Sequence, residues 1–239
     1  MSTRLYPADF YARRREHTAG AARRILAALP PGLPMARVAD IGCGTGTFLA
    51  ASLDRGARSA VGLEGDWVTP DMLDDVRIGF LQHDLELPIL GIAADLVISL
   101  EVAEHLSSER AAGFVADLVA MAPAVLFSAA IPGQGGVGHR NEQWQSYWAG
   151  LFASHGYGAY DLIRPAIWTD ETIPAWYRQN TVLYLAPLLA SGLGLTAETP
   201  SRLDVVHPAF WARANRELGY ANALPESEVL RRRSEGADG

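Results

Sequence analysis

The chain has 239 residues, of which 49% are hydrophobic and 20% charged, with a formal net charge of −7, so we expect one globular domain without the clustered positive charge that grips nucleic acid. No apolar run reaches the ~20 residues of a membrane helix and the N-terminus shows no apolar signal segment, which predicts a cytoplasmic protein without membrane contact. All 20 basic residues are arginine and Cys43 is the single cysteine, which excludes a catalytic lysine, an intrachain disulfide and a cysteine-based zinc site.

Predicted strands and helices alternate along most of the chain. An amphipathic helix is predicted over residues 8–29, and further helices over 48–53, 107–120 and 142–155. Strands are predicted over 36–41, 59–63, 76–81, 93–100, 125–131, 157–163 and 181–186. Such alternation through short loops predicts an α/β fold: a doubly wound, mostly parallel seven-stranded sheet with helices on both faces and an antiparallel edge strand. We expect a single domain with an N-terminal helix or cap (1–34), a core (35–186) and a C-terminal helical extension (187–239) that ends in a disordered tail.

The turn after the first predicted strand carries the strongest signal. Gly42, Gly44 and Gly46 allow a sharp turn and close approach of a ligand, and the next helix points its N-terminal amides into that turn. The spacing G-x-G-x-G differs from the G-x-G-x-x-G of dinucleotide-binding proteins, and Asp40 stands just before the first glycine. A nicotinamide-dependent oxidoreductase is therefore the weaker alternative.

The segment from Asp40 to Gly46 resembles motif I of the class I S-adenosylmethionine-dependent methyltransferases, in particular types 11 and 12, and the similarity extends in order over residues 38–130. It implies a Rossmann-like fold with S-adenosylmethionine as cofactor. Asp40 and the glycine turn would face its methionine part, Glu64 the ribose hydroxyls and Asp84 the adenine amino group. An aromatic ring beside the ribose-binding acid suits stacking, so Trp67 would cover the adenine unless it is a core or surface residue. The cofactor-binding residues implied in this way are Asp40, Gly42, Cys43, Gly44, Gly46, Glu64, Gly65, Trp67, Asp84, Leu85 and Leu100.

An E-x-x-E-H motif, made of Glu101, Glu104 and His105, follows the fourth predicted strand. On a helix these positions share one face, and the glycine-rich segment after the fifth strand would bring His139 to the same place. The four residues suit Mg²⁺ or Mn²⁺. The set is similar to that of small-RNA terminal 2′-O-methyltransferases, and E-x-x-E-H to that of ubiquinone-pathway O-methyltransferases. Alternatively, the carboxylates only cap a helix or orient loops and His139 is a general base without a metal. The candidate catalytic residues are His139, His105 and Glu101.

Polar and aromatic side chains over residues 133–148 and 164–180 predict contacts with a polyhydroxylated acceptor. Tryptophans 148, 168 and 176 would stack on it unless they belong to the core, and arginines 140, 164 and 178 would meet a phosphate or carboxylate. We therefore predict an O-methyltransferase that acts on a sugar, glycan or secondary metabolite, with a small-molecule substrate, no nucleic acid, no membrane and a homodimer as one option for its assembly. The alternatives are metal-independent N-methylation of an amine and a cofactor-binding protein without turnover.

Overall fold

The computed structural model describes the backbone of residues 8–217 and the side chains of residues 18–213, so the predicted disordered tail lies outside the described residues. The chain up to Val205 forms one compact unit, and a second unit begins at Val206 and includes α8 (Pro208–Glu217). The strands are β1 (Arg37–Ile41), β2 (Ser59–Glu64), β3 (Gly79–Gln82), β4 (Leu96–Leu100), β5 (Ala124–Ser128), β6 (Gly158–Tyr160) and β7 (Val182–Leu185). The other α-helices are α1 (Ala8–Ala27), α2 (Thr47–Asp54), α3 (Ala111–Met121), α4 (Gln145–Ser154), α5 (Ile163–Ile167), α6 (Ala175–Asn180) and α7 (Pro187–Gly192).

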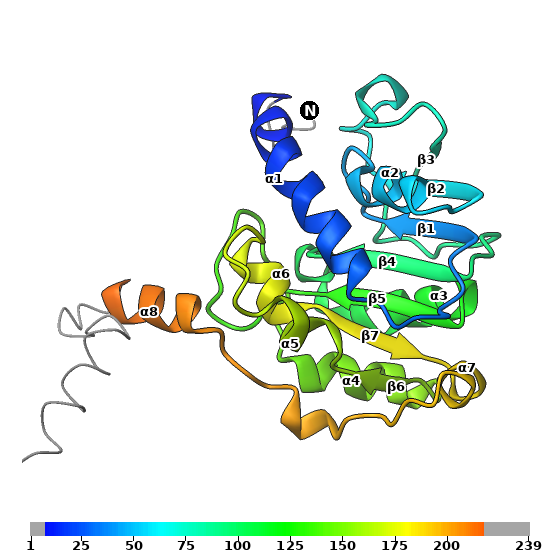
Figure 1. Ribbon diagram of the computed structural model, residues 1–239. Helices are drawn as coiled ribbons and strands as arrows, with labels where there is room; N and C mark the ends of the chain where they lie inside the picture. Colours follow the sequence, from blue (N-terminus) through cyan, green and yellow to red (C-terminus); the bar gives the residue numbers. More distant parts are fainter. Residues whose placement is uncertain (1–7, 218–239) are drawn as a thin grey trace, which may run out of the picture. The chain divides into compact units, whose positions relative to one another are not determined.

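The seven strands form one sheet in the order β3-β2-β1-β4-β5-β7-β6 (Figure 1). Strands β1 to β5 are parallel, whereas β7 runs antiparallel to both β5 and β6. The predicted seven-stranded, mostly parallel sheet is confirmed. Its antiparallel strand lies one place in from the edge because α5 and α6 separate β6 from β7, so β7 can insert beside β5 instead of closing a tight hairpin.

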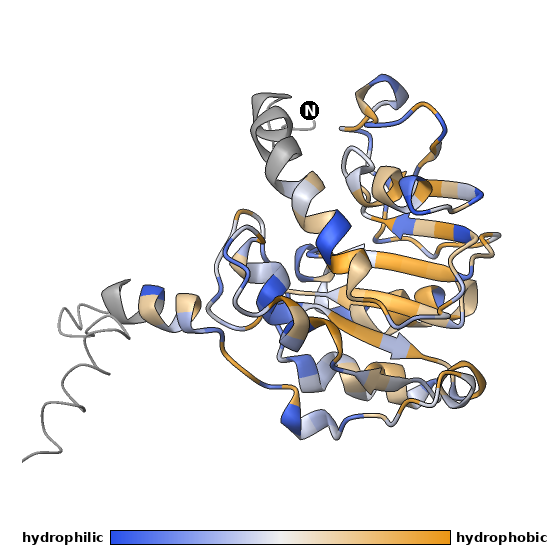
Figure 2. Ribbon diagram, viewed as in Figure 1, coloured by the Kyte–Doolittle hydropathy of each residue, from blue (hydrophilic) through white to orange (hydrophobic). Residues whose placement is uncertain are grey.

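Helices cover both faces of the sheet, as predicted. One apolar cluster joins residues of α1, α2 and α5 to one face, and a second joins residues of α3 and α4 to the other. The side chains of β5 show the period of two that this arrangement requires, since Leu126 packs in the first cluster while Val125 and Phe127 pack in the second. The central strands β4, β5 and β7 are accordingly the most hydrophobic ribbons in Figure 2. Among the described helices, none is long and apolar enough to cross a membrane.

Parallel strands bring their carboxyl ends to one edge of the sheet, where ligands bind in open α/β folds. Ile41, Glu64, Gln82, Leu100 and Ser128 end the five parallel strands at this edge. Asp40, Glu64 and Leu100 lie at or next to the ends of these strands, and the other predicted cofactor-binding, catalytic and metal-binding residues lie in the segments that follow, so the fold brings them to one edge of the sheet.

Candidate functional site

The glycine turn between β1 and α2 directly holds a carboxylate. Gly42, Gly44 and Gly46 have φ values of 82°, 53° and 79°, a conformation that residues with a Cβ rarely adopt. The backbone N–H of Gly44 donates to one carboxylate oxygen of Glu64 (2.9 Å), and that of Gly65 donates to the other (3.0 Å). Glu64 is therefore oriented at the end of β2 by both segments that meet there.

Asp40 and Glu64 are buried carboxyl groups on neighbouring strands, 4% and 8% exposed. Burial raises the pKa of Asp40 well above its usual range, and the charge of Glu64 raises it further. Burial also raises the pKa of Glu64, against the effect of its two backbone hydrogen bonds. A positive charge nearby would favour the ionised form of both groups, so this pair suits a cationic ligand.

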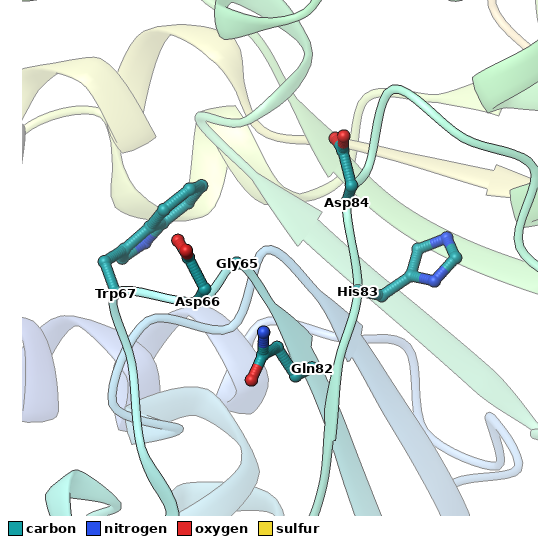
Figure 3. A pocket seen from close by; sticks show the side chains of 6 residues that line it. All are labelled: Gly65, Asp66, Trp67, Gln82, His83 and Asp84. Carbon is teal, nitrogen blue, oxygen red and sulfur yellow. The ribbon is translucent and has the colours of Figure 1, made fainter. Parts of the chain in front are cut away.

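A cavity of about 370 Å³ opens between the segment after β2 and the end of β3. Trp67 and Asp84 stand on opposite sides of it in Figure 3, and Gly65 and His83 are also in its wall. The indole of Trp67 lies directly against Gly65, because a Cβ at that glycine would come within 2.2 Å of the ring. The volume of this cavity falls within the range of small-molecule sites, about 300–1,000 Å³. Trp67, Gly65 and Asp84 are thus placed together as the sequence predicts, while contact with adenine stays a prediction.

Three other residues predicted to bind the cofactor have buried side chains. The thiol of Cys43 packs against Gly62, and its burial, with the charges of Asp40 and Glu64, raises its pKa. Leu85 and Leu100 pack in the two apolar clusters. A role of these three residues in cofactor binding stays a prediction.

Glu101 does not continue β4 into a helix. Its φ of 57° is the one positive value among the non-glycine residues that the structure describes, a conformation that costs about 1–3 kcal/mol and is frequent at functional sites. Its carboxylate accepts hydrogen bonds from the amides of Asn180 (3.0 Å) and Gln134 (2.9 Å), and its backbone N–H donates to Ser128. The predicted helix face for E-x-x-E-H is therefore wrong, because the chain makes a left-handed turn at its first residue.

Glu104, His105 and His139 do come together. One ligand atom from each lies within 4.8 Å of the others, and the two imidazole rings meet edge to face with their centroids 4.9 Å apart. Glu104 is fully buried on the 3₁₀ turn Ala103–His105, and neither of its carboxylate oxygens has a hydrogen-bond partner. Burial raises the pKa of Glu104 well above its usual range, and the charge of Glu101 adds to the shift. Of the four predicted metal ligands, Glu104, His105 and His139 form this cluster. Glu101 is not part of it, because its carboxylate turns toward Gln134 and Asn180.

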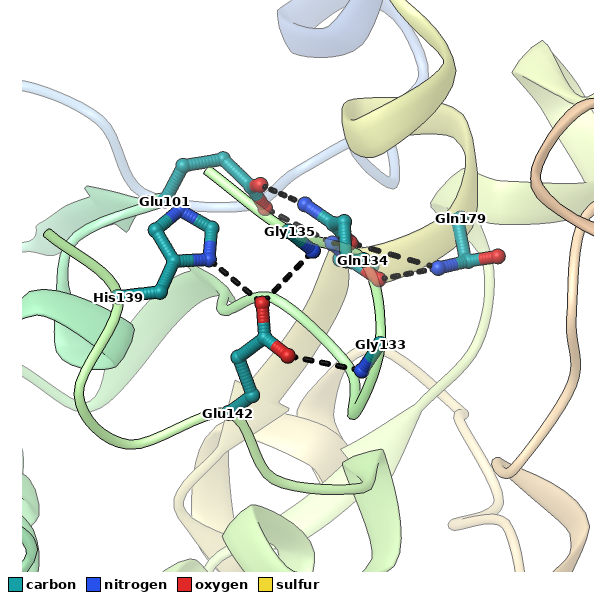
Figure 4. A network of polar contacts seen from close by, with 8 residues as sticks. Glu101, Gly133, Gln134, Gly135, His139, Glu142 and Gln179 are labelled. Carbon is teal, nitrogen blue, oxygen red and sulfur yellow. Dashed lines mark hydrogen bonds and ion pairs between the residues drawn. The ribbon is translucent and has the colours of Figure 1, made fainter. Parts of the chain in front are cut away.

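The loop after β5 is organised around Glu142, which the sequence analysis did not single out (Figure 4). One of its oxygens accepts from the backbone N–H of Gly135 (2.8 Å) and lies 2.8 Å from Nδ1 of His139, and the other accepts from the backbone N–H of Gly133 (2.8 Å). The available signal was an H-x-x-E spacing within a glycine-rich segment. Both glycines have positive φ, which lets the loop turn its amides toward one carboxylate.

Two residues predicted to contact the acceptor are structural. Arg164 is 1% exposed, and its guanidinium donates hydrogen bonds to the Asp161 carboxylate and to the backbone oxygens of Gln179 and Leu203. Trp148 is 1% exposed and packs on the face of the sheet covered by α4. The core alternative therefore holds for Trp148, and the predicted ligand contact of Arg164 is wrong because its guanidinium is bound within the core beneath the loops.

The glycine turn and the Glu101–His105 segment are in direct contact. Val102 packs on Gly42 so closely that a Cβ at this glycine would come within 2.4 Å of its side chain. The two segments follow the adjacent parallel strands β1 and β4. The segments that carry the carboxylate pair and the histidine cluster therefore lie side by side at the carboxyl edge of the sheet.

Comparison with known proteins supports this fold. No protein-family model matches the chain, and no curated protein sequence matches it. Solved structures do. Magnesium protoporphyrin IX methyltransferase from Synechocystis PCC 6803, with bound S-adenosylhomocysteine, is 17% identical with a TM-score of 0.53 over 74% of this chain and 85% of that chain. An amino pentose methyltransferase of calicheamicin biosynthesis from Micromonospora echinaspora, with bound S-adenosylmethionine, is 17% identical with a TM-score of 0.50 over 77% of this chain and 99% of that chain.

An O-methyltransferase of neocarzinostatin biosynthesis, bound to S-adenosylhomocysteine and 1,4-dihydroxy-2-naphthoic acid, is 17% identical with a TM-score of 0.54. That match covers 75% of this chain and 57% of the other. With the sheet order described above, these likenesses show that the chain has the fold of the class I S-adenosylmethionine-dependent methyltransferases.

Proposed function

We propose that this protein transfers a methyl group from S-adenosylmethionine to a hydroxyl group of a small polar acceptor, such as a sugar, a glycan unit or a secondary metabolite. The observation that carries the proposal is the direct contact between the glycine turn and the Glu101–His105 segment through Gly42 and Val102. The glycine turn would offer carboxylates to a cationic donor, and the Glu101–His105 segment, with His139 beside it, would bring an imidazole near that donor.

On the donor side, each group has a distinct task. Asp40 and the glycine turn would face the charged methionine part. The carboxylate oxygens of Glu64, which accept from the amides of Gly44 and Gly65, would also accept from the ribose hydroxyls. Trp67 and Asp84, on the two sides of the cavity, would hold the adenine ring by stacking and by its amino group.

On the acceptor side, a hydroxyl must lose its proton as it attacks. The acceptor oxygen forms a bond to the methyl carbon while the carbon–sulfur bond breaks, and S-adenosylhomocysteine leaves with the electron pair. His139 would take the hydroxyl proton on its second ring nitrogen, since Nδ1 is engaged by Glu142. The protein gains rate mainly by aligning the two reactants, because the sulfonium donor is already activated.

The residues of the histidine cluster also fit a divalent cation. Glu104 offers two buried oxygens without hydrogen-bond partners, and His105 and His139 offer nitrogens within 4.8 Å. These three residues would hold Mg²⁺ or Mn²⁺, and Glu101 would keep its contacts with the amides of Gln134 and Asn180. In that case the second ring nitrogen of His139 would bind the cation and would not take the hydroxyl proton, because Nδ1 is engaged by Glu142. Such a cation would lower the pKa of an acceptor hydroxyl.

Two alternatives have different consequences. N-methylation of an amine needs neither a cation nor strong base catalysis, and one structural neighbour is an amino pentose methyltransferase. A nicotinamide-dependent oxidoreductase is disfavoured by the sheet, since β7 lies antiparallel between β5 and β6, unlike the all-parallel order 3-2-1-4-5-6 of dinucleotide-binding folds.

Calorimetric titration with S-adenosylhomocysteine and with NADH tests the donor site. We expect saturable binding of S-adenosylhomocysteine alone; binding of NADH alone would contradict the proposal. Once binding of S-adenosylhomocysteine is shown, the protein would be screened with labelled S-adenosylmethionine against hydroxylated sugars, phenols and amino sugars, with and without EDTA. Transfer to hydroxyls supports the proposal, loss of transfer in EDTA supports the cation, and EDTA-resistant transfer to amines alone favours N-methylation.

A further inference from the structure

We infer that Glu142 is a positioning residue that holds His139 in the tautomer required for the reaction, with the hydrogen on Nδ1 and the lone pair on Nε2. This inference rests on the proposed function and identifies a group that the sequence pattern did not assign. It is drawn from the hydrogen bonds within the loop after β5.

The carboxylate of Glu142 is surrounded by donors. Two of them, the backbone N–H groups of Gly133 and Gly135, can only donate, and they reach different oxygens at 2.8 Å. The third contact joins Nδ1 of His139 to the same oxygen that Gly135 reaches, again at 2.8 Å. An ionised carboxylate has no proton to give, so Nδ1 carries the hydrogen. In a neutral imidazole the lone pair then lies on Nε2, the nitrogen available to a proton or a cation.

The loop also fixes the position of the imidazole ring. The ring of His139 occupies the space beside Gly136, where a Cβ would come within 2.1 Å of Nε2. The next two residues, Arg140 and Asn141, donate their backbone N–H groups to the carbonyl oxygen of Glu104 at 2.7 and 3.0 Å. The loop is thereby anchored to Glu104 on one side and to Glu142 on the other, with His139 between these anchors.

The simpler interpretation of Glu142 is a loop brace that has no effect on the tautomer of His139, and an alanine at this position distinguishes the two interpretations. A glutamine would not, because its oxygen can replace the carboxylate oxygen that faces both Gly135 and His139 and so keep the hydrogen on Nδ1. Alanine removes the acceptor from Nδ1, so nothing holds the hydrogen there and both tautomers become populated. If Glu142 does not set the tautomer, the hydrogen stays on Nδ1 in the variant.

The test is ¹⁵N NMR of histidine-labelled full-length protein at about pH 9, where histidine side chains are neutral. The signal of His139 is assigned by its loss in His139→Asn. We expect wild type to carry the hydrogen on Nδ1, and Glu142→Ala to populate the tautomer with the hydrogen on Nε2. The matched control is Asp204→Asn, since Asp204 also accepts a backbone N–H and a side-chain hydroxyl, both from Ser146. This change should leave the tautomer of His139 unchanged.

A wild-type protein with the hydrogen on Nε2, or a Glu142→Ala protein with the hydrogen still on Nδ1 alone, would overturn the inference. The wild-type spectrum alone decides the first point, even where the variant does not fold. Binding of S-adenosylhomocysteine, measured on the same samples, should be equal in wild type and Glu142→Ala. If wild type does not bind S-adenosylhomocysteine, the proposed function is refuted, while the tautomer is still read from the NMR spectrum.

A kinetic cycle tests whether Glu142 acts through His139. With an acceptor that wild type methylates, Glu142→Ala should lower kcat by about 10²-fold or more, within the range of general acid–base catalysis, with little change in KM for S-adenosylmethionine. In the His139→Asn background the same change should cost almost nothing further. Additive losses would show a brace that acts independently of His139.

Discussion

Replacing Glu64 with alanine separates cofactor binding from folding at one residue. The side chain makes two hydrogen bonds to backbone amides in the structure, at 2.9 and 3.0 Å, and would share its oxygens with two ribose hydroxyls when the nucleoside binds. A hydrogen bond to a charged group contributes about 1.5–3 kcal/mol, and about 1.4 kcal/mol corresponds to a tenfold change in affinity. Loss of the ribose contact therefore predicts about 10- to 100-fold weaker binding of S-adenosylhomocysteine.

The effect of Glu64→Ala on stability should be smaller, because two terms oppose each other. Removing the side chain leaves the amides of Gly44 and Gly65 without their acceptor, but it also removes a buried carboxylate. Burial outweighs these two hydrogen bonds in setting the raised pKa of Glu64, so much of their contribution is already offset. We expect the free energy of unfolding to change by no more than about 1 kcal/mol.

Calorimetry and urea unfolding measure the two quantities on the same protein. The matched control is Glu109→Ala, which removes an exposed glutamate and should change neither quantity. Wild-type affinity in a folded Glu64→Ala protein would refute the assignment of Glu64 to the ribose. A large loss of stability in this variant would instead show that the carboxylate mainly holds the turn.

Two further predictions concern the turn and the loop. Asp40 has a raised pKa in the folded protein, so the unfolded state ionises first and the contribution of Asp40 to stability falls as pH rises above about 4; Asp40→Asn should remove this loss, and urea unfolding between about pH 4 and pH 8 should show the variant gaining on wild type as pH rises. A difference in free energy of unfolding between the two proteins that does not change with pH would contradict a raised pKa of Asp40. Gly136→Ala would bring a Cβ within 2.1 Å of His139, so we expect methyl transfer to fall at least tenfold while S-adenosylhomocysteine still binds. Gly150→Ala is the control: no atom lies within 4 Å of a Cβ at this helical position, so activity should be retained and stability should rise by up to about 1 kcal/mol. Equal activity in the two glycine variants would show that the position of His139 is unimportant.

The sequence by itself determined the elements whose signals are local. Strand β2 was predicted over residues 59–63 and ends at Glu64, because a short apolar run between turns needs no distant information. The spacing of Gly42, Gly44 and Gly46 predicted a turn that requires positive φ, which the structure confirms. Asp40, Glu64 and Asp84 could be expected at one edge because parallel strands share a direction.

Only the tertiary structure decided the parts that depend on partners far along the chain. The left-handed turn at Glu101 is held by Asn180, 79 residues away, so no local pattern could distinguish it from a helix start. Arg164 is structural because a carbonyl 39 residues later accepts its hydrogen bond. Strand β7 lies beside β5 because its apolar faces complete both cores there, and a two-residue periodicity does not specify which neighbour a strand takes. The pairing of Glu142 with His139 likewise needed the folded loop, whose glycines turn the backbone until carboxylate and imidazole meet.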